Sequence, residues 1–365
     1  MPHVTVNAVK ASLHFIPNYY FALTQSYTTS PITGMMARLN SAALCAISVL
    51  ALFAFTGCGM FFVDEGAHSV PQTIETEQGP RFMAFDGEHV WVAFFGALKV
   101  SKYTIDGQNV ADFPIEDYPR ALAFDGEHMW VGRSAVNSIL KLNMDGEVID
   151  TVSIGTPDTS PAAMTFDGES VWVAASWGNS VTKVGLDGTA ARTVRIPGYH
   201  PSPWAITHDG GEVWVASMGS TMVDRLDKAG DLTGSFRVAE WPKGRSEAWG
   251  GGGTAIEFDG ESIWVTVASK NSVVKLSNDG AVLGEYPVGR WPTAVVHAAD
   301  SIWVANFLDN TVTRLDMDGT LLDTLEVGRG PHALLQISDT MWVANFQGDS
   351  ITVLPMKPAG MKPAG

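Results

Sequence analysis

Short apolar segments, rather than long helical faces, dominate the pattern of this chain. Segments such as "SVWVAA" (170–175) and "SVTKVGL" (180–186) are rich in β-branched and aromatic residues, and Gly or Asp-Gly interrupts the chain every ten residues or so. The "VWVA" segments are apolar at consecutive positions, as expected of strands that are covered on both faces. The pattern therefore predicts an all-β protein of short strands and argues against helices.

The same unit of strands and turns occurs seven times. Its third copy predicts four strands, "AAMTF", "SVWVAA", "SVTKVGL" and "RTVR", separated by turns at Asp167-Gly168 and Asp187-Gly188. Each copy carries one tryptophan, and these are Trp91, Trp130, Trp172, Trp214, Trp264, Trp303 and Trp342. Seven units of about 40 residues predict a seven-bladed β-propeller over residues 71–355, with four antiparallel strands per blade.

The two ends of the repeat region complement each other. The last unit stops after its third strand, "SITVL" (350–354), and "TIETEQGPRF" (73–82) aligns with "TLEVGRGPHA" (324–333). We therefore expect residues 73–77 to supply the fourth strand of blade seven. This closure would remove an open sheet edge.

The segment ahead of the repeats has a different composition. No Asp or Glu precedes residue 58, and Arg38 is followed by an uninterrupted apolar run from Ala42 to Phe55. That run has the length of the apolar region of a signal peptide and is short for a membrane span. An ordinary signal peptide or a short anchor helix would both fit this pattern.

The residues after that run resemble the lipobox of bacterial lipoproteins. Thr56-Gly57 precede Cys58, although Phe55 replaces the usual aliphatic residue. The resemblance implies acylation of Cys58 and, because Gly59 is not acidic, transport to the outer membrane. We expect residues 1–34 to be an upstream extension or leader, 35–57 a lipoprotein signal peptide, 58–70 a tether and 356–365 a disordered tail. Removal of Cys45 with the signal would leave no intrachain disulfide.

Charge limits the choice of partner. The chain of 365 residues has a net charge of −16, and binding DNA or RNA requires clustered Lys and Arg. We therefore expect no nucleic-acid partner. The expected protein is a monomer that reaches the membrane through its N-terminal lipid.

The repeat "P-x-A-[IVL]…DG…[VI]-W-V-A…N-S-V-x-K-L…DG" resembles those of NHL-type and YVTN-type propellers, and especially the streptogramin B (virginiamycin B) lyase-like family. The resemblance covers residues 73–355. It implies a lyase in which histidines and glutamates from several blades hold a divalent metal. Only His332, in "GPHA", matches a histidine position of that pattern; its neighbours are Arg81 and Thr293. Because a metal site needs about three or four ligands, we predict no catalytic residue, metal or cofactor. A metal-dependent lyase or hydrolase is the alternative function.

One position in each blade is variable and is expected near the mouth of the central channel. It follows a proline in every blade except the fifth, and its residues are Arg81, Arg120, Ala162, Trp204, Thr254, Thr293 and His332. Arginine suits recognition of carboxylate or phosphate, so Arg81, Arg120 and His332, joined by Arg133, suggest a site for a small anionic ligand or acidic peptide. Alternatively, the arginines pair with Glu116 and Asp117 and only hold the loops.

The spacing of 50 residues between Trp214 and Trp264 marks an insertion before blade five. The segment "AEWPKGRSEAWGGGG" (239–253) carries Trp241, Arg245 and Trp249 and is expected on the same face as Trp204. Exposed Trp and Arg are typical of binding surfaces, although the tryptophans would equally fit folded back over the blades. Together these features predict an envelope-anchored lipoprotein that binds a ligand, peptide or protein on its loop face.

Overall fold

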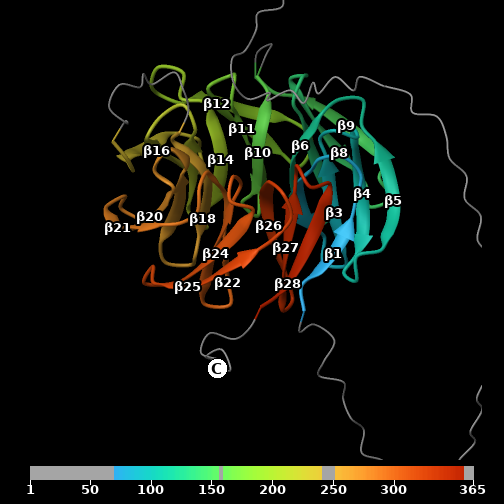
Figure 1. The fold of residues 1–365 in the computed structure, drawn as a ribbon. Helices are drawn as coiled ribbons and strands as arrows, with labels where there is room; N and C mark the ends of the chain where they lie inside the picture. The colour runs from blue at the N-terminus through green and yellow to red at the C-terminus, as the bar shows by residue number, and fades with distance from the viewer. Residues whose placement is uncertain (1–69, 156–158, 241–250, 357–365) are drawn as a thin grey trace, which may run out of the picture. The chain divides into compact units, whose positions relative to one another are not determined.

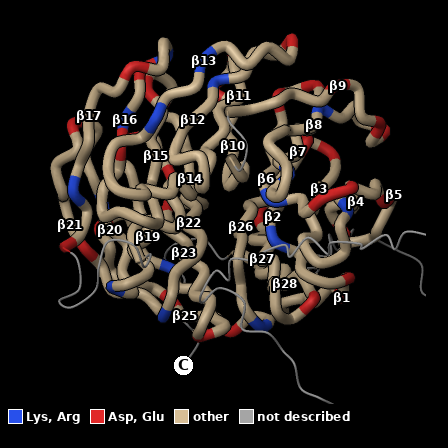
Figure 2. The backbone as a smooth tube through the Cα atoms, turned by 90° about the horizontal axis from the view of Figure 1, so that it is seen from above, with Lys and Arg blue, Asp and Glu red and all other residues tan. Residues whose placement is uncertain are grey.

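Seven four-stranded antiparallel sheets are arranged in a ring around a central axis (Figure 1, Figure 2). The computed structural model describes residues 70–155, 159–240 and 251–356. Within these ranges the one helix is a single 3-10 turn, η2 (Ala268–Lys270), and no helix is long and apolar enough to cross a membrane. The prediction of an all-β, seven-bladed propeller is confirmed.

Each blade runs from an inner to an outer strand. Blade one contains β2 (Pro80–Phe85), β3 (His89–Phe94), β4 (Lys99–Thr104) and β5 (Asn109–Pro114). Blade two contains β6 (Pro119–Phe124), β7 (Met129–Arg133), β8 (Ser138–Leu142) and β9 (Val148–Ser153). Blade three contains β10 (Pro161–Phe166), β11 (Ser170–Ala175), β12 (Ser180–Gly185) and β13 (Ala190–Arg195). Blade four contains β14 (Pro203–His208), β15 (Glu212–Ser217), β16 (Met222–Asp227) and β17 (Leu232–Arg237). Blade five contains β18 (Gly253–Phe258), β19 (Ile263–Val267), β20 (Ser272–Leu276) and β21 (Val282–Pro287). Blade six contains β22 (Pro292–Ala298), β23 (Ser301–Asn306), β24 (Thr311–Asp316) and β25 (Leu321–Glu326). Blade seven contains β26 (Pro331–Ile337), β27 (Thr340–Asn345), β28 (Ser350–Pro355) and β1 (Gln72–Glu75).

Several predicted features lie outside the described residues. They are the leader (1–34), the signal peptide (35–57) with Cys58 after it, nearly all of the tether, the loop residues Trp241, Arg245 and Trp249, and the tail from residue 357.

The strand that closes the ring is β1. It pairs antiparallel with β28, from Gln72 opposite Val353 to Glu75 opposite Ser350. Figure 1 shows β1, in blue, beside the red strand β28. The predicted closure is confirmed, with the strand at 72–75 rather than 73–77.

The repeated tryptophan is the centre of each blade's packing. All seven are at most 1% exposed, and the apolar clusters combine adjacent blades, as where Trp91 packs with Leu122 and Met129 of the next blade. In blades one to five the indole N–H donates to the aspartate of the turn before it, at 2.7–2.8 Å. The Asp-Gly turn is therefore also a hydrogen-bond partner that satisfies a buried donor.

A cationic side chain on the third strand joins each of the first five blades to the next. Lys102 lies over the Trp91 ring, 5.0 Å from its centroid, and its Nζ donates to the carbonyl of Met144 in blade two at 2.7 Å. We call this arrangement the inter-blade clamp. Four further clamps repeat it, each with a side-chain donor and a backbone carbonyl acceptor in the next blade: Lys141 to Leu186, Lys183 to Lys228, Arg225 to Asn278, and Lys275 to Met317.

Candidate functional site

The seven variable positions share one backbone geometry. Pro80 pairs with Phe94 and Phe82 pairs with Ala93, so the register of the two strands shifts at Arg81, which forms a β-bulge. The same irregularity occurs at the start of the inner strand in all seven blades. A bulge changes the direction of a side chain relative to the regular strand. The blades therefore present these residues as one set, which we call the ring positions.

The loops that lead into the inner strands are held by the preceding blade. Asp349 of blade seven accepts a hydrogen bond from the Gly79 N–H at 2.9 Å, two residues before Arg81. Asn137 accepts from the Thr159 N–H at 2.7 Å in the same way. Equivalent bonds run from Ser202 to Asn179, Trp291 to Asn271 and Gly330 to Asn310. The ring positions therefore stand on loops that are tied to a rigid neighbour.

Arg81 and His332 meet across the ring closure. The Arg81 Nε–H donates to His332 Nε2 at 3.2 Å, which places the proton of a neutral imidazole on Nδ1. Nδ1 is buried and has no hydrogen-bond partner within the described residues. The Arg81 guanidinium also lies 4.8 Å from the Phe95 ring centroid and 5.4 Å from that of Phe346.

Phenylalanines form the walls around His332. Its ring centroid lies 5.3 Å from that of Phe82, 6.0 Å from Phe346 and 6.4 Å from Phe307. The prediction missed this aromatic surround. A signal existed for two of the three, because two copies of "WVANF" place Phe307 and Phe346 at the same position of blades six and seven.

Arg120 stacks on a tryptophan of blade four. Its guanidinium carbon lies 4.1 Å from the Trp204 ring centroid, and its Nη1 is 3.4 Å from the Ser160 hydroxyl. The ring position of the intervening blade is Ala162, whose small side chain leaves room for this contact. Cation–π stacking of this kind is strongest where water is excluded, and Arg120 is only 6% exposed.

The site is electropositive. Burial lowers the pKa of Arg120 well below its usual range, and the charge of Arg81 adds to this. Burial likewise lowers the pKa of His332, with further lowering by Arg81 and Arg120. His332 is therefore neutral at neutral pH, while the arginines carry charge.

The acidic residues expected to pair with the arginines have other roles. The Asp117 carboxylate accepts hydrogen bonds from the backbone N–H groups of Ala135 and Val136, at 2.8 and 3.1 Å, and Glu116 is exposed. No salt bridge within the described part of the chain involves Arg120 or Arg133. Buried Arg120 therefore lacks a counter-charge among the residues that the structure describes.

Other ring residues serve the fold. The hydroxyl groups of Thr254 and Thr293 donate to the carbonyls of Pro292 and Pro331 in the following blade, at 2.7 and 2.9 Å. Arg133 donates to the Ser138 hydroxyl within its own hairpin at 2.5 Å, and no described contact joins it to Arg120. The structure thus brings together Arg81, Arg120, Trp204 and His332.

A divalent metal does not fit this set of donors. His332, the one imidazole among the ring positions, already accepts a hydrogen bond through Nε2, and two guanidinium groups adjoin it. Over residues 70–155, 159–240 and 251–356 there is no group of three His, Cys, Asp or Glu side chains able to hold an ion. Cationic neighbours would also repel a metal, so the residues at the mouth do not support a metal-dependent step.

No protein-family model matches the chain, and no curated protein sequence matches it significantly. Solved structures do match. Virginiamycin B lyase from Staphylococcus aureus superimposes with a TM-score of 0.68 at 19% identity, covering 79% of this chain and 99% of the lyase.

Two further structures show how widely this architecture is used. A streptogramin B lyase has a TM-score of 0.68 at 20% identity, covering 79% of this chain and 98% of its own. Hydrazine synthase from Kuenenia stuttgartiensis has a TM-score of 0.65 at 18% identity, covering 80% and 98%. Because one architecture carries such different chemistry, the likeness is one of fold. The chain is a seven-bladed β-propeller that resembles the virginiamycin B lyases in its architecture.

Proposed function

We propose that the channel mouth binds a small ligand through an anionic group, with Arg120, Arg81 and His332 as its contacts. The observation that carries this proposal is the state of Arg120. A guanidinium that is 6% exposed, with no ion pair in the described chain, is costly to keep buried. An anion would offset that cost.

The unused hydrogen-bond donors support the same ligand chemistry. Arg120 Nε and His332 Nδ1 are both buried and without partners within the described residues. Stacking on Trp204 orients the plane of the Arg120 guanidinium, whose edge can then bind carboxylate or phosphate through two parallel hydrogen bonds. A rigid frame of bulges and held loops reduces the entropy that is lost on binding.

We further propose that this propeller is a lipoprotein of the bacterial envelope. The apolar run ending at Phe55, the small residues after it and Cys58 support lipid attachment, and Gly59 supports the outer membrane as destination. The propeller would then present its channel mouth to solutes or partner proteins at the membrane surface.

Isothermal titration calorimetry tests the binding proposal. The purified wild-type protein and the variants Arg120→Gln and Arg81→Gln would each be titrated with acetate, citrate and inorganic phosphate. Loss of one charged hydrogen-bonding group should weaken binding by roughly tenfold or more. Arg192→Gln, a matched change on the outer strand β13, should leave affinity unchanged. Equal heats for the wild-type protein and both ring variants would contradict the proposal.

A further inference from the structure

The inter-blade clamp shows what occupies the space between two blades at the face opposite the channel mouth. In five successive blades a Lys or Arg side chain crosses a tryptophan ring and donates to a turn carbonyl of the next blade, at 2.5–2.9 Å. The accepting residue is the second in its turn each time, so the five clamps are equivalent. The fold itself therefore defines which side chain fits there.

The junction between blades seven and one lacks this clamp. In blade one Lys102 pairs with Trp91, and the equivalent pair in blade seven is Val353 with Trp342. An apolar valine therefore replaces the cationic residue. Ile337 stands five residues before Trp342, in place of the aspartate, and the buried Trp342 Nε1 has no hydrogen-bond partner in the described chain. The equivalent acceptor in blade one is the carbonyl of Ile105, to which no described hydrogen bond is made.

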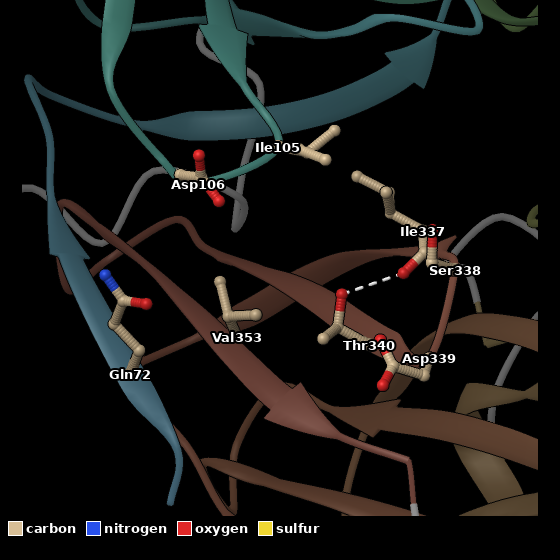
Figure 3. Close-up of a pocket in the computed structure, with 8 residues that line it drawn as sticks. All are labelled: Gln72, Ile105, Asp106, Ile337, Ser338, Asp339, Thr340 and Val353. Atoms are coloured by element: carbon tan, nitrogen blue, oxygen red, sulfur yellow. Dashed lines mark hydrogen bonds between the residues drawn. The ribbon is translucent and has the colours of Figure 1, made fainter. Parts of the chain in front are cut away.

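A cleft lies at this position (Figure 3). It has a volume of about 110 Å³ and is lined by Gln72, Ile105, Asp106, Ile337, Ser338, Asp339, Thr340 and Val353. A single water needs about 10–15 Å³ of such volume, so a side chain would fit. Figure 3 shows Ile105 and Asp106 facing Val353 and the Ile337–Thr340 turn across the hollow.

We propose that this cleft binds a lysine side chain, and that the C-terminal segment 357–365 supplies it. The backbone N–H of Met356 donates to the Asp339 carbonyl at 2.8 Å, so the chain leaves β28 at the rim of the cleft. Lys357 is the next residue, and Lys362 repeats it in the doubled pentapeptide "MKPAGMKPAG".

The lining matches an alkylammonium group. Ile105, Ile337 and Val353 provide apolar contact for the methylene chain, as Trp91 does for Lys102. The carboxylates of Asp106 and Asp339, with the Ile105 carbonyl, provide acceptors for the ammonium. The segment would thus complete a sixth clamp, with a lysine from beyond β28 in place of one on the strand, and lock the closed ring.

A double-variant cycle tests this. Ending the chain at Met356 should lower Tm by about 2 °C or more, as loss of one buried clamp implies. Replacing both tail lysines, Lys357→Ala with Lys362→Ala, should reproduce that loss, whereas Met361→Ala should not. Val353→Lys, which installs the residue type of blades one, two, three and five, should raise Tm in the shortened chain and change it little in the full chain.

The cycle and a cross-link together make the proposal falsifiable. A carbodiimide should join a tail lysine to Asp106 or Asp339 in the full chain, and Asp106→Asn with Asp339→Asn should abolish the linked peptide in mass spectra. Absence of that peptide, an unchanged Tm on shortening, or an equal effect of Val353→Lys in both chains would overturn the proposal. None of these outcomes depends on ligand binding at the channel mouth.

Discussion

At the scale of single residues, seven equivalent positions carry two kinds of chemistry. Thr254 and Thr293 use their hydroxyls to tie one blade to the next, whereas Arg81 and His332 bring nitrogen donors together at the channel mouth. The proline before most of these positions made the set recognisable in the sequence. That Arg120 would reach Trp204 across Ala162 was not recognisable, because the contact joins blades that are two apart.

Glu257 is a half-buried acid that gives stability a pH dependence. It lies opposite Trp264, and burial raises its pKa to about 8, with a smaller contribution from Asp259. Because the folded pKa exceeds the unfolded one, the folded state keeps the proton as the pH rises. The free energy of unfolding should therefore fall between about pH 4.5 and pH 8.

Glu257→Gln tests this effect because the amide has the same shape and no charge. At pH 9 the free energy of unfolding of the variant, measured by urea titration, should exceed that of the wild-type protein by on the order of 2–4 kcal/mol. Below about pH 4 the two should be nearly equal. The same difference at every pH would show that ionisation of Glu257 is not the cause.

At the scale of elements, β1 joins the two ends of the repeat region. Ile74 packs with Trp342 and Val90, and Lys99 of blade one forms ion pairs with Glu77 and Asp112 at 3.0 and 2.9 Å. The strand covers the outer edge of β28, which would otherwise expose unpaired backbone groups. Its four residues therefore hold together strands more than 270 positions apart.

Deletion of residues 69–78 should lower the thermal stability of the protein sharply. The ladder to β28 and the Ile74 contacts would be lost together, and the open edge would favour aggregation. Differential scanning calorimetry measures the change, and deletion of the upstream residues 59–68 is the control. If the melting temperature stayed the same, closure by β1 would contribute no stability.

At the scale of the whole molecule, charge is distributed unevenly. The chain carries a net charge of −16, yet Lys and Arg positions on β2 and β6 lie beside the centre of the ring (Figure 2). An acidic protein with a basic mouth should disfavour nucleic acids while attracting a small anion at short range. Ligand affinity at the mouth should accordingly weaken as salt increases.

Lipid attachment at Cys58 is tested by Cys58→Ser. We expect the wild-type protein in the membrane fraction and less of the variant there, because the substitution removes the thiol that would be acylated. Labelling with a radioactive fatty acid should mark the wild-type protein alone. Membrane recovery of the variant in equal yield would contradict the lipoprotein proposal.

The sequence by itself determined the fold, because local signals repeat. Asp-Gly turns, "VWVA" strands and the spacing of seven tryptophans are properties of short segments, and the truncated last unit indicated where the ring closes. The sequence also determined which residue stands at the bulge of each inner strand, because the repeat aligns these positions.

Only the tertiary structure decided how those residues combine. The aromatic surround of His332, the stacking of Arg120 on Trp204 and the missing clamp beside Val353 all depend on side chains from different blades. A repeat indicates where each residue lies in its blade. The direction and the partners of its side chain depend on the sizes of neighbours that are distant in the chain. Packing between blades, rather than the pattern within them, decides the chemistry of the site.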